Sequence, residues 1–377
     1  MSTQGNTPSI GDMISRLLEE QKSNNFNVRT IERPSVVEVM PEAPWASAPD
    51  PISIRTNTSL TKVVPDYERN TLRIVKPDNT PGSIIGIEGL RQLGIMTGYK
   101  VDFVNKLPLN MRAEVINEVI RQHREQDIQF IGEDETITQT VPQYRNICKH
   151  SEVAQIAFNT MQGICAKTGS SASVKNYNST AGNMELHVVS SLQEKITAHR
   201  GDILNFGVII EHKYGSHLGV SLGIERLICE NGMTVVNKGY SWSTKAGEVS
   251  DQLDYVVIGI NECITQFAIT ASRARIMAET MIQGDPREAL IARARNMKLD
   301  SAYFPDLVNA WEQEPGNSEW HMVNAFTRLA THNKSIEDKT RRNIQAASGA
   351  WTHEFNVVNA RLPRQIAERV GAQIIEN

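Results

Sequence analysis

Hydrophobic and polar residues alternate most regularly in the centre of the chain. In HLGVSLGIERLIC (residues 217–229) small and apolar residues alternate, the dipeptide Asn231-Gly232 follows, and an apolar run restarts at Met233. Alternation with a period of two on both sides of an Asn-Gly pair is typical of two antiparallel strands joined by a turn. We expect strands at residues 184–191, 203–213, 218–229, 233–236 and 240–244. The β-rich centre at 184–245 therefore predicts an antiparallel sheet.

The periodicity changes to that of helices in the part from residue 254 to 377. Apolar residues recur there at spacings of three and four, proline is absent from 255–283, and Pro286 is typical of a helix start. We expect helices at 255–283, 286–298, 304–312, 320–331, 336–348 and 363–375. Strands followed by helices indicate an α+β fold, with a central antiparallel β-sheet followed by a helical C-terminal half.

The amino-terminal part has a different composition. Residues 1–25 are rich in Ser, Asn and Gln, with one short amphipathic segment, and six prolines interrupt residues 30–65. We expect residues 1–65 to form a flexible arm and a proline-rich wrapping segment, with the arm dispensable for folding. A single α+β domain is expected from 66 to 377. Its first part predicts strands at 71–75, 127–131 and 136–141, helices at 86–93, 109–125 and from 151, a turn at 77–82 and a loop at 170–181.

Composition and charge narrow the classes of function. The 377 residues are 40% hydrophobic and 22% charged, as in ordinary globular proteins. No apolar run approaches the roughly 20 residues of a membrane span, so we expect a cytoplasmic protein without a membrane partner. A net charge of −4 gives no overall attraction to phosphate. Any binding of nucleic acid therefore needs a local basic surface.

Three segments carry a resemblance to a known family. They are RGDILNFGVIIEHKYGSHLGVSLGIERLICENGM (residues 200–233), WHMVNAFTRLATH (residues 320–332) and, more weakly, VPQYRNICKHSEV (residues 141–153). Between residues 140 and 350 the chain resembles the phage- and plasmid-borne family defined by the domain of unknown function 932. The resemblance implies a phage or mobile-element accessory protein in the host cytoplasm, and it implies no particular activity.

Candidate catalytic groups are sparse. Cys229 has His212 and His217 on the preceding strand and turn, but its neighbours are apolar and favour a packing role. The four cysteines lack the paired spacing of a metal site, so we expect no cofactor. The acidic residues on the expected strands lack the lysine pattern of a nuclease. A non-enzymatic protein is therefore favoured, and a metal-dependent nuclease or a thiol enzyme stays an alternative.

Basic and aromatic residues suggest where a ligand could bind. Alternation puts Tyr240 and Trp242 on one face of a strand, where they could stack on bases. Arg226 sits in an apolar strand, and His332 closes a helix whose dipole favours a cation. The candidate nucleic-acid-binding residues are Arg226, Tyr240, Trp242, Arg273, Arg275, Arg293, Arg295, Arg341 and Arg342.

These residues favour a single-stranded DNA binding or annealing protein that acts in recombination. Ring-forming annealing proteins share the order of sheet and helices, which is an analogy of fold and raises a homo-oligomer as a partner. The alternative is an inhibitor that docks on a host protein of a defence or restriction system. The net negative charge of the chain would suit a surface that docks on such a host protein.

Overall fold

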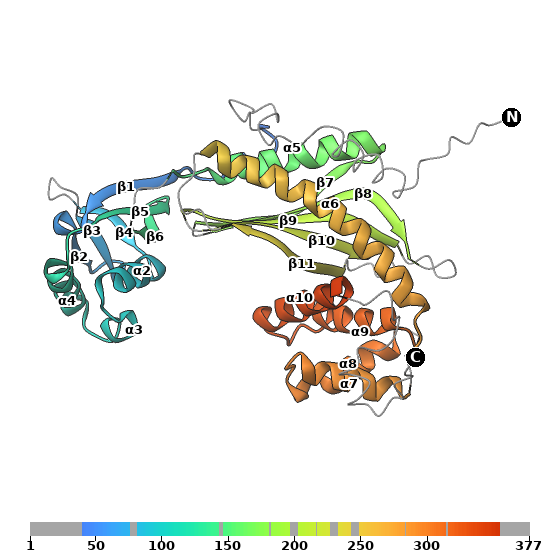
Figure 1. Cartoon of the computed structure of the whole chain (residues 1–377). Helices are drawn as coiled ribbons and strands as arrows, with labels where there is room; N and C mark the ends of the chain where they lie inside the picture. The colour runs from blue at the N-terminus through green and yellow to red at the C-terminus, as the bar shows by residue number, and fades with distance from the viewer. Residues whose placement is uncertain are drawn as a thin grey trace.

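A computed structural model shows two units that follow one another in the sequence (Figure 1). Each unit is built on its own β-sheet. The structure describes residues 40–75, 81–142, 146–180, 182–196, 203–215, 217–226, 233–242, 249–282, 284–313 and 316–354. Several predictions from the sequence fall outside these ranges: the whole arm at 1–25, the Asn231-Gly232 turn, Cys229 and the helix at 363–375. The mixed α+β class is confirmed.

The N-terminal unit is a six-stranded sheet with helices packed against it. Its strand order is β1-β5-β6-β4-β3-β2, antiparallel except for the parallel β4–β6 pair. The elements are β1 (Pro51–Asn57), η2 (Thr58–Leu60), β2 (Lys62–Asp66), β3 (Thr71–Val75), β4 (Pro81–Ile85), α2 (Ile87–Thr97), α3 (Val101–Val104), α4 (Leu109–Gln122), β5 (Asp127–Glu133) and β6 (Thr136–Val141). The wrapping segment expected up to residue 65 is wrong for residues 51–57 and 62–65, which form β1 and most of β2. Proline is tolerated there, because Pro51 starts β1 and Pro65 lies on the edge strand β2.

The central sheet has the predicted antiparallel arrangement, with order β11-β10-β9-β8-β7. It follows helix α5 (His150–Thr168), and its strands are β7 (Ala172–Thr180), β8 (Asn183–Lys195), β9 (Ile203–Lys213), β10 (His217–Arg226) and β11 (Met233–Trp242). The expected loop at 170–181 is wrong, because most of it forms β7. The two strands expected at 233–244 are one continuous strand.

The C-terminal part is helical, as predicted. Its elements are α6 (Val249–Glu279), α7 (Pro286–Asn296), η3 (Ser301–Tyr303), α8 (Phe304–Glu312), α9 (Glu319–His332) and α10 (Asp338–Glu354). The side chain of Asp285 accepts a hydrogen bond from the backbone N–H of Arg287, and Pro286 occupies the first turn of α7, where it needs no hydrogen-bond donor. A β-bridge between Met281 and Ser318 brings the start of α9 next to the end of α6.

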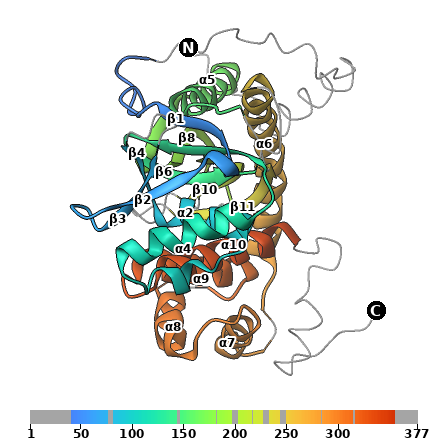
Figure 2. The same ribbon diagram turned by 90° about the vertical axis from the view of Figure 1, so that its left-hand side faces the viewer.

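Helices cover the central sheet on two sides (Figures 1 and 2). Helices α5 and α6 lie over one face, and α9 and α10 lie below it. Buried apolar side chains of β8, β9 and β10 pack against α5 and α6, as in the contact between Phe206 and Phe267 at 5.5 Å. A Cβ atom at Gly259 would lie 2.8 Å from the Cβ of Val220. Helix α6 therefore approaches the sheet as closely as a residue without a side chain allows.

The two units meet at a small apolar cluster. Ile131 and Val141 of the first sheet pack against Tyr214 at the end of β9. Gly215 beside it has φ of +63°, and a Cβ there would lie 2.3 Å from the Cδ1 of Ile131. Each unit has a separate larger core of its own.

Two glycine-to-alanine variants test the close packing of α6 against the central sheet. Alanine is a better helix former than glycine by about 1 kcal/mol, but at Gly259 its Cβ would collide with Val220. We expect Gly259→Ala to lower the free energy of unfolding by about 1–3 kcal/mol, measured by urea denaturation. Gly163 of α5 is the matched control, because a Cβ there meets nothing within 4 Å. Gly163→Ala should stabilise the protein, and equal effects of the two variants would contradict the packing described.

Candidate nucleic-acid interface

The basic residues predicted on α6 lie at one end of the central sheet. Arg275 pairs with Glu194 and donates a hydrogen bond from Nε to the carbonyl oxygen of Lys195 at 2.9 Å. Arg273 is half-buried, and its Nη1 is buried without a hydrogen-bond partner. Arg275 is therefore paired within the protein and Arg273 is partly covered by it, so the two do not form an exposed basic stripe.

Arg293 is part of the interior, which corrects its place among the nucleic-acid-binding candidates. Its side chain is 2% exposed, and its Nη2 lies 2.7 Å from the carboxylate of Glu319, which is 0% exposed. The guanidinium carbon stands 3.9 Å from the ring centre of Trp351 on α10. Burial lowers the pKa of Arg293, while the carboxylate of Glu319 opposes that shift. The cluster joins α7, α9 and α10, whereas Arg295 is exposed on α7.

Tyr240 and Trp242 lie on β11, and the aromatic platform expected from them stays a prediction. Backbone pairing places Tyr240 opposite Val220 and Trp242 opposite Leu218, and both partner side chains are buried in the core below α6. Arg226 ends β10 and pairs through its backbone with Met233. The side chains of these three candidates lie outside the described part of the structure.

Arg341 and Arg342 lie at the start of α10, far from the arginines of α6. Arg342 is 70% exposed and stands 3.6 Å from Glu185 near the start of β8, whereas Arg275 contacts Glu194 near its end. Nine residues of strand separate these two glutamates, roughly 30 Å at about 3.3 Å per residue. Arg341 is half-buried and donates to the carbonyl oxygen of Ile336 at 3.2 Å. The predicted arginines thus do not form one groove.

A compact basic surface at the turn between α9 and α10 was only partly anticipated. Residues 328–342 contain five lysines and arginines and two acids, a local net charge of +3 in a chain of net charge −4. The α9–α10 basic surface comprises Arg328, His332, Lys334, Lys339, Arg341 and Arg342. The density of basic residues in this window is the signal that could have identified it.

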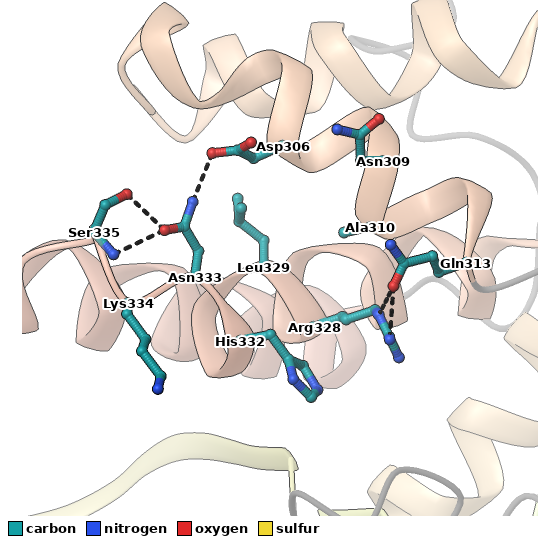
Figure 3. Close-up of a pocket in the computed structure, with 10 residues that line it drawn as sticks. All are labelled: Asp306, Asn309, Ala310, Gln313, Arg328, Leu329, His332, Asn333, Lys334 and Ser335. Atoms are coloured by element: carbon teal, nitrogen blue, oxygen red, sulfur yellow. Dashed lines mark hydrogen bonds between the residues drawn. The ribbon is translucent and has the colours of Figure 1, made fainter.

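A pocket of about 520 Å³ opens beside this surface, between α8 and α9 (Figure 3). Its lining residues are Asp306, Asn309, Ala310, Gln313, Arg328, Leu329, His332, Asn333, Lys334 and Ser335. In Figure 3 the side chains of His332 and Lys334 point away from α8, while that of Arg328 reaches towards Gln313. The pocket therefore combines three basic side chains with amide groups.

Hydrogen bonds hold the walls of the pocket. Arg328 donates from Nε and Nη2 to Oε1 of Gln313, at 3.0 and 2.7 Å, which links α9 to α8. Asn333 donates from Nδ2 to Asp306 at 2.6 Å and accepts hydrogen bonds from Ser335. The C-terminal dipole of α9 also favours cations here. Such an arrangement can bind phosphate oxygens and hydrogen-bonding bases.

Two buried histidines form a separate polar cluster near the junction of the units. The Nδ1 atoms of His150 and His212 lie 2.8 Å apart, and the ring of His150 stacks on Tyr214 at 3.8 Å. Burial lowers the pKa of His150 to about 4 and that of His212 well below its usual value. Both imidazoles are therefore neutral near pH 7, so that one Nδ1 donates to the other.

The described cysteines have the character of packing residues. Cys148, Cys165 and Cys263 are buried, and burial raises the pKa of Cys263 to about 12. The pKa of Cys148 is raised by burial and by the carboxylate of Glu152. No group of three His, Cys, Asp or Glu side chains among the described residues is placed to hold a metal ion.

Comparison with protein-family models, curated proteins and solved structures finds no match for the chain. Within the part of the chain that the structure describes, no helix is long and apolar enough to cross a membrane.

The histidine pair predicts how stability depends on pH. The pKa of His150 is lower in the folded protein than the value of 6.5 expected when it is exposed, so its stabilising contribution is complete above pH 6.5. That contribution is lost as the pH falls towards 4, by an amount of the order of 3 kcal/mol. We expect urea denaturation between pH 7.5 and 4.5 to show this loss, with a flatter profile for His150→Gln. His332→Gln, at an exposed position, should keep the wild-type slope, and an unchanged slope in His150→Gln would refute the assignment.

Proposed function

We propose that the protein binds single-stranded nucleic acid through the α9–α10 basic surface. The observation that carries this proposal is the local charge of +3 over residues 328–342 in an acidic protein, where Lys334, Lys339 and Arg342 are exposed. Lys334 and Lys339 are exposed, and no ion pair is found for either within the described residues. Cations of this kind attract phosphate, because binding releases the counterions that surround a nucleic acid.

The pocket between α8 and α9 favours a single strand rather than a duplex as the ligand. Its amide groups, from Asn309 and Gln313, lie beside Arg328 and His332. An unpaired base can enter such a pocket and form hydrogen bonds there, whereas the bases of a duplex are stacked and paired. Phosphates on either side of that base would then face the lysines. This arrangement requires no chemical step, in keeping with a non-enzymatic role.

Annealing and a phage or mobile-element setting belong to the same proposal. The setting rests on the resemblance of residues 140–350 to the family with the domain of unknown function 932. Annealing rests on the order of an antiparallel sheet followed by helices.

A protein partner is the second candidate function, and the N-terminal unit favours it. Its helices carry four large apolar side chains at the surface, Ile87, Ile95, Phe103 and Met111, with exposed fractions of 59%, 77%, 63% and 43%. Apolar groups concentrated on one small unit are typical of a protein-docking surface. This function would leave the basic surface unused.

Fluorescence anisotropy with a labelled single strand of about 30 nucleotides tests the proposal, since that length covers the larger single-strand sites of about 16 nucleotides. We expect micromolar or tighter binding at low salt that weakens as salt rises. Each phosphate contact contributes about −0.7 to the slope of log K against log salt. Replacing Lys334, Lys339 and Arg342 together by alanine should therefore flatten the slope by about 2 units.

The matched control is the double variant Lys62→Ala, Lys106→Ala, which removes exposed lysines from the N-terminal unit. It should bind like the parent protein. Absence of binding at low salt would reject the proposal and favour the protein partner. An equal loss in both sets of variants would show attraction without a defined site.

A further inference from the structure

An apolar pocket of about 530 Å³ lies at the point where the described chain begins. Apart from Glu42, its lining is made of apolar side chains: Met40, Pro41, Ala43, Pro44, Trp45, Phe158 and Val174. These come from three parts of the chain, namely the segment before β1, helix α5 and strand β7. Phe158 and Val174 are half-buried, and Met40 is 38% exposed.

The floor of this pocket is fixed by hydrogen bonds and ring contacts. The side-chain oxygen Oε1 of buried Gln155 accepts hydrogen bonds from the indole of Trp45 and from the backbone N–H of Met40, both at 2.9 Å. The ring of Trp45, which is 0% exposed, packs on Phe158 at 5.7 Å and on Tyr177 at 6.0 Å. The pocket is therefore a preformed apolar surface, which lowers the entropic cost of filling it.

We propose that the amphipathic segment at residues 10–18 of the same chain docks into this pocket. Residues 1–39 lie outside the described structure, and their sequence contains one run with apolar residues at i, i+3, i+4, i+7 and i+8. The five residues are Ile10, Met13, Ile14, Leu17 and Leu18. Folded as a helix, they would form one apolar face about 13 Å long.

The position of the pocket makes this segment the fitting occupant. Met40 lines the pocket and is also the first described residue, so the preceding chain starts at its rim. Residues 19–39, 21 in all, connect the segment to Met40 and reach at most about 70 Å when extended. A tether of this length gives an effective concentration in the millimolar range, which favours the segment of the same chain over that of a second copy.

Docking would also cover an exposed part of the central sheet. Val174 lies on β7, which forms a free edge of that sheet. An edge strand presents unpaired N–H and C=O groups that can recruit another strand. The arm expected from its composition to be dispensable for folding thus gains a specific place beside this edge.

Disulfide trapping in the full-length chain tests the proposal. Val174→Cys is combined with Leu17→Cys or Ile14→Cys on the apolar face, and with Glu19→Cys on the opposite face as the control. Under mild oxidation we expect a fast intramolecular disulfide for at least one apolar-face pair and a slow one for the control. Equal rates for the two faces would overturn the proposal. Cross-linked dimers without the intramolecular product would show that a second copy fills the pocket.

Trypsin cleavage after Arg16 provides an independent readout in the protein without added cysteines. Phe158→Asp places a charge in the half-buried wall of the pocket and should release the segment. A docking free energy of 1–2 kcal/mol corresponds to cleavage that is faster by about fivefold or more. Phe103→Asp removes an exposed phenylalanine of the N-terminal unit and should leave cleavage unchanged. If Phe158→Asp keeps the parent's circular dichroism and cleavage rate, the segment does not dock there.

Discussion

Helix α6 can lie across the central sheet only because residue 259 has no side chain. At this point the helix backbone faces the side chain of Val220, and an added Cβ would lie within 3.1 Å of three of its atoms. The apolar side chains of α6 on either side of the contact, such as Ile260 and Phe267, are then buried against the strands. Because α6 has 31 residues, this one contact also sets where its far end lies.

The far end of α6 decides the position of the remaining helices. The bridge between Met281 and Ser318 places the start of α9 beside the end of α6. Helix α10 then runs below the sheet (Figure 1), and Arg342 near its start faces Glu185 of β8. The buried ion pair of Arg293 and Glu319 joins α7 to α9. Such a pair stabilises little in total, but loss of one partner leaves a buried charge and costs about 3–5 kcal/mol. The basic surface is thereby held on a rigid frame.

The sequence predicted those elements whose pattern is decided locally. Strands β3, β6 and β9 and helix α8 have the expected bounds, because alternation or helical spacing is unbroken and turn residues flank them. Strand β7 was missed since an edge strand needs few apolar residues, and most of its side chains are polar or exposed. The turn expected at 77–82 overlaps the start of β4, because Pro81 and Gly82 are typical turn residues. Whether β4 and β7 form strands depends on the strands beside them in the sheet rather than on their local sequence pattern.

The site was harder to predict than the fold. Arg341 and Arg342 were identified by their charge, but the same reasoning selected Arg293, whose partner Glu319 lies 26 residues away. Spacing on a helix shows which residues share a face and does not show which face is buried. The role proposed for Lys334 depends on a pocket built by α8 and α9 together. No local pattern in the sequence shows that α8 and α9 pack together at this point.

Chemical footprinting of lysines tests most directly whether the α9–α10 basic surface holds the nucleic acid. The rates of acetylation of individual lysines are compared by mass spectrometry with and without a saturating single-stranded oligonucleotide. We expect Lys334 and Lys339 to be protected, while Lys62 and Lys106 of the N-terminal unit react at unchanged rates. Binding of the oligonucleotide without protection of Lys334 and Lys339 would contradict this account, because the phosphate backbone would then lie elsewhere on the protein.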